Sequence, residues 1–169
     1  MLADGVDEMI RVVREQFYKG ASQIKIMAGG GCSSEHDPIP TVQYSLREMR
    51  AAVEATRDYG TYVMATVPAI MWAAKAGVKS FEHAYMMDEK AARAIQEKGS
   101  FVVPMPQFNK VNKGVPARLS QNRMVVRERE ATSTELINKY NLKILFGTDL
   151  MVHDPAMEPQ DSVDLTYYE

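Results

Sequence analysis

The chain has 169 residues and a formal net charge of −2, with 46% hydrophobic and 25% charged residues. These values are typical of one globular domain and give no electrostatic reason to expect binding to nucleic acid or to an anionic membrane. No apolar run approaches the roughly 18 residues that a membrane-spanning helix needs. Cys32 is the only cysteine, so no internal disulfide bond can form, and we expect a reducing, cytoplasmic location.

Helices and short apolar strands alternate from the N-terminus onwards. Asp4 is the expected N-cap of a first helix that stops at Gly20, and a strand at Gln23–Met27 follows it. Ser45 and Glu48 have the spacing of a capping box, which indicates the start of a second helix. The further expected elements are strand Tyr62–Thr66, helix Pro68–Ala76, strand Val78–His83, helix Asp88–Lys98, strand Phe101–Met105, helix Leu119–Tyr140 and strand Lys143–Phe146.

This alternation predicts an α/β fold. Gly77, Gly99 and Asn141 stand where helices should end, because glycine and asparagine accept the left-handed conformation. Strands separated by helices require crossover connections, which make the strands parallel, and parallel sheets are normally covered by helices. We therefore expect about five parallel strands in one domain at residues 1–150, followed by an acidic C-terminal segment at 151–169.

Polar residues interrupt three of the strands at positions that burial alone does not explain. Lys25 lies inside the first strand, Glu82 and His83 end the third, and Asp149 follows the fifth. Lysine is rarely fully buried unless it is paired or chemically modified. Because binding sites of α/β proteins lie at the carboxyl ends of the strands, we expect Lys25, His83 and Asp149 to converge on one metal-binding site.

Five segments resemble, in order, the later strands of the metal-dependent amidohydrolase superfamily. They read QIKIMAGGG, YVMAT, AGVKSFEHA, GSFVVPMPQF and ILFGTD. They are most similar to the branch that holds imidazolonepropionase-like and Xaa-Pro dipeptidase-like enzymes. The resemblance implies a partial TIM (β/α)8-type barrel, and a hydrolase that acts on the C–N bond of an amide-like or dipeptide-like small molecule.

The resemblance also implies roles for three residues. Lys25 matches a lysine that becomes carboxylated and bridges two metal ions, and His83 matches a histidine ligand. Asp149 matches an aspartate that binds metal and accepts a proton from the attacking water, as a general base does. The implied cofactor is a divalent metal, commonly zinc, which imidazole and carboxylate groups bind well.

Two features depart from the family pattern. No segment before Gln23 resembles the His-x-His pair of the family's first strand, and Thr66 stands where another ligating histidine is expected. Five strands are also fewer than the eight of a closed barrel. We expect this chain to be the later portion of such an enzyme, incomplete and weak or inactive by itself.

Simpler interpretations remain open for each site residue. Lys25 could extend its amine into solvent from the strand end, and His83 could be a partly buried histidine hydrogen-bonded to Glu82. Asp149 could serve a turn or cap the following helix. His36 and His153 are in polar loops, where we expect solvated side chains rather than substitute ligands.

Two functions of other classes compete with the hydrolase. A non-catalytic α/β fragment could self-associate into a homo-oligomer through open sheet edges. A flavodoxin-like domain could use the glycines at 29–31 to hold an anion, although no Gly-Lys-Ser/Thr sequence follows them. Metal content, oligomeric state and nucleotide binding distinguish the three.

Overall fold

The structure is a computed structural model that describes residues 1–31, 38–66, 69–105 and 117–147. Five helices and five strands alternate in these ranges. The helices are α1 (Val6–Tyr18), α2 (Leu46–Arg57), α3 (Ile70–Ala76), α4 (Glu89–Lys98) and α5 (Ala117–Lys139). The strands are β1 (Ile24–Met27), β2 (Val63–Thr66), β3 (Ser80–Glu82), β4 (Phe101–Val103) and β5 (Lys143–Ile144).

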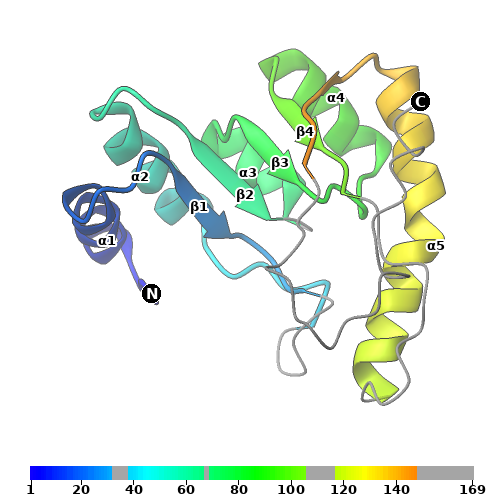
Figure 1. Cartoon of the computed structure of the whole chain (residues 1–169), viewed down its shortest axis with the longest axis horizontal. Coiled ribbons are helices and arrows are strands. Elements are labelled where there is room, and N and C mark those ends of the chain that lie inside the picture. The colour runs from blue at the N-terminus through cyan, green and yellow to red at the C-terminus, as the bar shows by residue number, and fades with distance from the viewer. Residues whose placement is uncertain (32–37, 67–68, 106–116, 148–169) are drawn as a thin grey trace, which may run out of the picture.

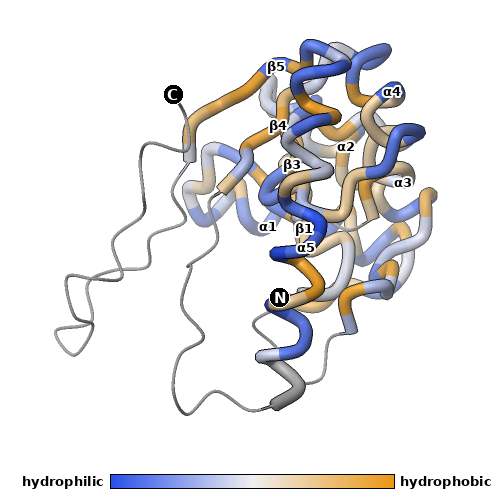
Figure 2. The backbone as a smooth tube through the Cα atoms, turned by 90° about the vertical axis from the view of Figure 1, so that its right-hand side faces the viewer, coloured by the Kyte–Doolittle hydropathy of each residue, from blue (hydrophilic) through white to orange (hydrophobic). Residues whose placement is uncertain are grey.

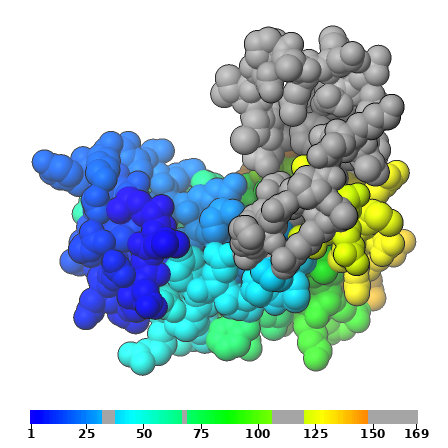
Figure 3. Space-filling model, turned by 90° about the horizontal axis from the view of Figure 1, so that it is seen from below, coloured from blue at the N-terminus to red at the C-terminus, as the bar shows by residue number. Residues whose placement is uncertain are grey.

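The strands form one parallel sheet in the order β1-β2-β3-β4-β5, which confirms the predicted fold class. Each helix packs on the next in the chain, from α1 against α2 to α4 against α5. Figure 1 shows α2 and α3 behind the sheet, and α5 at the right, at the end of the sheet opposite α1. Figure 3 shows the same order of elements from below, with α1 at one end of the molecule and α5 at the other. The arrangement is an arc of a β/α barrel.

Alternating burial along β1 shows which face of the sheet the helices cover. Ile24 and Ile26 belong to the main hydrophobic core with the helices, whereas Lys25 is exposed and Met27 is 48% exposed. The strand register places Thr66 and Glu82 in the same row as Met27, and neighbours in such a row share a face. Lys25, Met27, Thr66 and Glu82 therefore lie on the face away from the helices, which is the interior of a closed barrel.

Most helix ends follow the predicted chemistry. Ser45 and Glu48 form the expected capping box, and the Asp88 side chain accepts a 2.7 Å hydrogen bond from the backbone of Ala91. Gly77 and Gly99 end α3 and α4 in the left-handed conformation. Pro68, which was expected to begin α3, lies outside the described residues. None of the described helices combines the length and the apolar character that crossing a bilayer demands.

The prediction that Asp4 caps α1 is wrong. Gly5 occupies the N-cap with φ 86° and makes no side-chain cap. The backbone N–H of Asp4 instead donates a 2.8 Å hydrogen bond to the Glu8 carboxylate. The Glu8 side chain thus satisfies a backbone donor just before the helix. The spacing of residues in the sequence does not show whether Asp4 or Gly5 is the N-cap.

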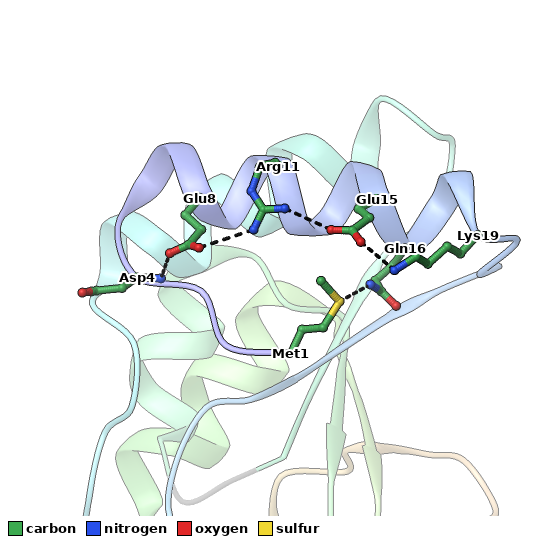
Figure 4. A network of polar contacts seen from close by, with 7 residues as sticks. All are labelled: Met1, Asp4, Glu8, Arg11, Glu15, Gln16 and Lys19. Atoms are coloured by element: carbon green, nitrogen blue, oxygen red, sulfur yellow. Dashed lines mark hydrogen bonds and ion pairs between the residues drawn. The ribbon is translucent and has the colours of Figure 1, made fainter.

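Charged side chains continue along the exposed face of α1, as Figure 4 shows. Arg11 lies between Glu8 at 3.4 Å and Glu15 at 3.0 Å, and Lys19 contacts the other oxygen of Glu15 at 2.6 Å. Each ion pair on a solvent-exposed helix contributes only about 0.3–0.5 kcal/mol. These contacts therefore support the helix locally rather than form a site.

Glu89 at the start of α4 joins this helix to the end of α5. One of its carboxylate oxygens accepts hydrogen bonds from the Lys139 amine at 2.7 Å and the Tyr140 hydroxyl at 2.6 Å. Arg93 donates to the same hydroxyl at 3.1 Å, and its guanidinium lies 5.6 Å from the Tyr140 ring centroid. Hydrogen bonds from Lys139 and Tyr140 lower the pKa of the Glu89 carboxyl from 4.5 to about 2.

We expect this contact to make stability depend on pH. Because the folded-state pKa of Glu89 is depressed, its contribution is complete above about 4.5 and disappears as the pH falls towards 2. Glu89→Gln should lower the melting temperature slightly at pH 7, and the difference from wild type should shrink at pH 2.5. Glu97→Gln on the same helix is the control. A difference that stays constant with pH would contradict the assignment.

Candidate functional site

Lys25 lies in the middle of β1 on the face away from the helices. Its side chain is exposed, and within the described residues it makes no hydrogen bond or ion pair. The apolar neighbours Ile24 and Ile26 hold the strand against the core, so the backbone at Lys25 is fixed while the amine is accessible. An accessible amine on a rigid strand can accept a modification or a ligand.

A buried carboxylate lies on the same face of β3. The Ser80 hydroxyl donates a 2.6 Å hydrogen bond to one carboxylate oxygen of Glu82, and the two residues are 2% and 6% exposed. A hydroxyl–carboxylate bond of this length is a strong one, and burial of a carboxylate requires such a partner. No motif in the sequence indicates a role for Ser80; the period of two along a strand is the one signal that places it on the same face as Glu82.

His83 is at the centre of a strained turn directly after β3. Its φ is 70°, and the N–H of Ala84 donates to the Glu82 carbonyl oxygen at 2.9 Å, which closes a γ-turn. Ala84 is also left-handed, with φ 45°. Such conformations cost about 1–3 kcal/mol for a non-glycine residue and concentrate at functional sites. Because of the turn, the strand alternation of side chains ends at His83.

The residues around this turn come from several elements. The N–H of His83 donates to the Val103 carbonyl of β4 at 3.0 Å, and the rings of His83 and Tyr85 lie 5.7 Å apart. The hydroxyl of Ser133 on α5 donates a 2.7 Å hydrogen bond to the Tyr85 carbonyl. Tyr85 also belongs to a second apolar cluster, whose buried members are Ile39, Tyr85, Val103, Met105 and Val126.

The chain leading to Asp149 follows β4 closely. The N–H of Leu145 donates to the Val102 carbonyl at 2.9 Å, so the pairing continues beyond β5. A Cβ at Gly147 would lie 2.7 Å from a methyl carbon of Val103, which explains why this position is a glycine. Asp149 itself lies outside the described residues.

Lys25 and His83 are on strands separated by β2. Lys25 is level with Ser80 in the register, three residues before His83, which sets their Cα atoms roughly 14 Å apart on ideal parallel-sheet spacing. Thr66, at the end of β2 between them, is buried and donates a 3.3 Å hydrogen bond to the Met27 sulfur. Threonine thus occupies the position where the family pattern predicts a ligating histidine.

The glycines after β1 are used in a backbone contact. Gly29 forms an antiparallel bridge with Val42, and the N–H of Gly30 donates to the Thr41 carbonyl at 3.2 Å. A Cβ at Gly30 would overlap the carbonyl oxygen of Pro38. This packing accounts for Gly30 without a bound anion, which weakens the flavodoxin-like interpretation.

In the described residues, we find no second candidate for a metal site away from the strand ends. A hollow of about 440 Å³ is lined by Asp7, Ile10, Arg11 and Arg14, all on α1 and none at a strand end. Within the described ranges, no three His, Cys, Asp or Glu side chains form a metal-ligating group. A metal site at the strand ends would therefore depend on Lys25 and on Asp149 as well as on His83.

Comparisons with known proteins identify relatives among hydrolases. The amidohydrolase family model matches residues 1–162. Ochratoxinase from Aspergillus niger is 41% identical over 105 residues, which are 60% of this chain and 22% of the relative. A prolidase solved in complex with N-methylphosphonate-L-proline superimposes with a TM-score of 0.82 at 39% identity, over 88% of this chain and 39% of that chain.

A Xaa-Pro dipeptidase with bound methionine in its active site superimposes with a TM-score of 0.80 at 28% identity. That match covers 88% of this chain and 39% of the dipeptidase chain. The present chain therefore spans well under half the length of these relatives.

Gly30→Ala tests the close contact after β1. The added Cβ has no room beside the Pro38 carbonyl, so we expect a loss of at least about 1–3 kcal/mol in the free energy of unfolding. Denaturant titration measures it. Gly20→Ala is the comparison, because Gly20 has φ 94° but nothing within 4 Å of an added Cβ. A smaller loss for Gly30→Ala than for Gly20→Ala would show that the contact is not rigid.

Proposed function

Because the chain belongs to the amidohydrolase family, we propose that it forms the part of a metal-dependent hydrolase that carries Lys25, His83 and Asp149. The reaction is hydrolysis of the C–N bond of an amide-like or dipeptide-like small molecule. The observation that carries the proposal is the sheet itself, whose parallel strands present Lys25 and His83 at β1 and β3 in a chain matched to prolidase and ochratoxinase structures.

Each residue has a distinct role in this proposal. The Lys25 amine, once carboxylated, offers two anionic oxygens, and the His83 imidazole offers a nitrogen donor. Asp149 accepts the proton of the attacking water as a general base. A divalent ion held by these groups, commonly zinc in the family, supplies Lewis-acid polarisation of the scissile carbonyl.

The residues fit such an ion in part. The Lys25 side chain is accessible to an ion, and His83 is partly buried at a strand end, where the backbone restricts its position. Thr66, a poor zinc ligand, replaces one donor of the family set, so we propose a reduced site with weak metal affinity. The chain also covers only 39% of the related prolidase chain, and we propose that efficient catalysis needs the remaining barrel strands.

Metal content provides the first test. In equilibrium dialysis against Zn²⁺ the purified chain should bind the ion, and Lys25→Ala, His83→Ala and Asp149→Ala should each weaken binding at least tenfold, because each removes a donor. Elemental analysis by mass spectrometry measures it.

The matched controls are Lys79→Ala and Asp58→Ala, which remove exposed charges elsewhere and should retain metal as wild type does. Wild type and all variants equally free of metal would end the proposal for this chain.

A second function is favoured by the edges of the sheet. Strands β1 and β5 are the terminal strands of the sheet. Ile144 and Phe146 at the β5 edge are 50% and 65% exposed, and Figure 2 shows a hydrophobic stretch there. Exposed hydrophobic edges promote pairing with another chain. A second copy of this chain is the partner in this non-catalytic alternative.

Sedimentation velocity tests it. A self-associating fragment should sediment as a defined dimer without metal, and Phe146→Glu should shift it to monomer, because the charge opposes burial of the edge. Trp72→Glu on α3, a 46% exposed aromatic in the helix layer, should leave the dimer intact. A compact wild-type monomer would exclude this function.

A further inference from the structure

Ser133 lies within the buried stripe of α5. Val126, Ser133 and Ile137 are the buried residues of this helix from position 120 on, and their spacing of seven and four residues places them on one face. Val126 packs in the second apolar cluster, which also contains Tyr85, and Ile137 packs in the main core. A serine between them is a polar residue where packing alone would select an apolar one.

The hydroxyl of Ser133 has a defined partner in the turn. It donates a 2.7 Å hydrogen bond to the Tyr85 carbonyl, between residues 48 positions apart, and Ser133 is 4% exposed. Buried polar groups need such partners, so the hydroxyl and the carbonyl fix each other's positions. The bond ties α5 to the segment between β3 and α4.

That segment needs support from outside. His83 and Ala84 both have positive φ, a conformation that non-glycine residues keep only when their surroundings impose it. Backbone bonds act directly on the turn, from the Ala84 N–H to the Glu82 carbonyl and from the His83 N–H to the Val103 carbonyl. The Ser133 hydroxyl adds a side-chain bond at Tyr85, two residues after His83.

We propose that Ser133 is a positioning residue, which holds the strained turn so that the His83 imidazole keeps one orientation for a ligand. The role of Ser133 in metal binding rests on the proposed hydrolase function, because it requires His83 to be a metal ligand. The orientation itself is a property of the metal-free chain. Supporting groups of this kind change metal affinity by roughly 10- to 100-fold in other metal sites.

Histidine NMR tests the orientation directly. The chain has three histidines, so the imidazole signals are few, and His83→Gln assigns those of His83. In the metal-free full chain, Ser133→Ala should shift or broaden the His83 signals. Ser133→Thr, which keeps a hydroxyl, should preserve them, whereas Ser133→Val, which has the shape of threonine without the hydroxyl, should not.

Ser100→Ala is the matched control. The Ser100 hydroxyl donates a 3.0 Å bond to the Val78 carbonyl and is equally buried, but it lies at the opposite end of the strands from His83. Both alanine variants should lower the melting temperature by a similar amount, and only Ser133→Ala should alter the His83 signals. Unchanged signals in Ser133→Ala and Ser133→Val, or equal changes in Ser100→Ala, would overturn the proposal.

Binding of Co²⁺ separates this inference from the proposed function. If the wild type binds Co²⁺, Ser133→Ala should weaken binding by roughly 10-fold or more, with an altered visible spectrum, and Ser133→Thr should restore it. If the wild type binds no Co²⁺ but its His83 signals depend on the Ser133 hydroxyl, the metal proposal fails and the positioning role stands. Affinity unchanged by Ser133→Ala in a wild type that binds would overturn the positioning role.

Discussion

One-sided burial of a parallel sheet is the constraint on which the other features depend. The helices pack on one another in chain order and cover a single face, so Ile24, Ile26 and Phe81 enter the core there. The other face carries polar groups, which are exposed at Lys25 on the edge strand and buried at Ser80 and Glu82 in the middle of the sheet. Lys25 can occupy the middle of β1 only because its side chain points away from the helices. In a sheet covered on both faces, the same lysine would need a partner or a different charge state.

The strand ends then carry groups that a simple core would not contain. Glu82 is buried with a strong hydrogen bond from Ser80, and His83 follows it in a γ-turn. Contacts from β4 and α5 hold this turn in one conformation. A preorganised ligand site needs such a fixed backbone, because ordering a mobile imidazole on binding costs free energy. The turn is therefore compatible with the binding role proposed for His83.

Comparison with the relatives explains which parts of the site are present. The matched prolidase and dipeptidase chains are more than twice as long as the matched region, so a closed barrel places further strands beside β1 and β5. The exposed residues Met27, Ile144 and Phe146 lie at those two edges. The same surface thus accounts for both candidate functions, completion of a barrel and self-association. Thr66 is the described position at which this chain departs from the expected ligand set.

Local signals in the sequence determined the elements and many of their ends. The capping box at Ser45 and Glu48, the cap at Asp88 and the left-handed Asn141 depend on neighbours a few residues away, so spacing sufficed to predict them. The parallel order of the strands followed from their alternation with helices. Asp4 failed as a cap because the helix begins one residue later, after Gly5 with φ 86°, and residue types alone do not decide between two adjacent starts.

Tertiary structure decided the contacts that join distant segments. The γ-turn at His83 depends on Val103, and its support by Ser133 spans 48 residues, so no local pattern indicated either. The role of Gly30 became clear only from the approach of Pro38, because a glycine run looks the same before a phosphate and before a backbone strand. Sequence fixes what each residue prefers locally, whereas the position of a side chain relative to a partner far along the chain depends on how the sheet and α5 pack.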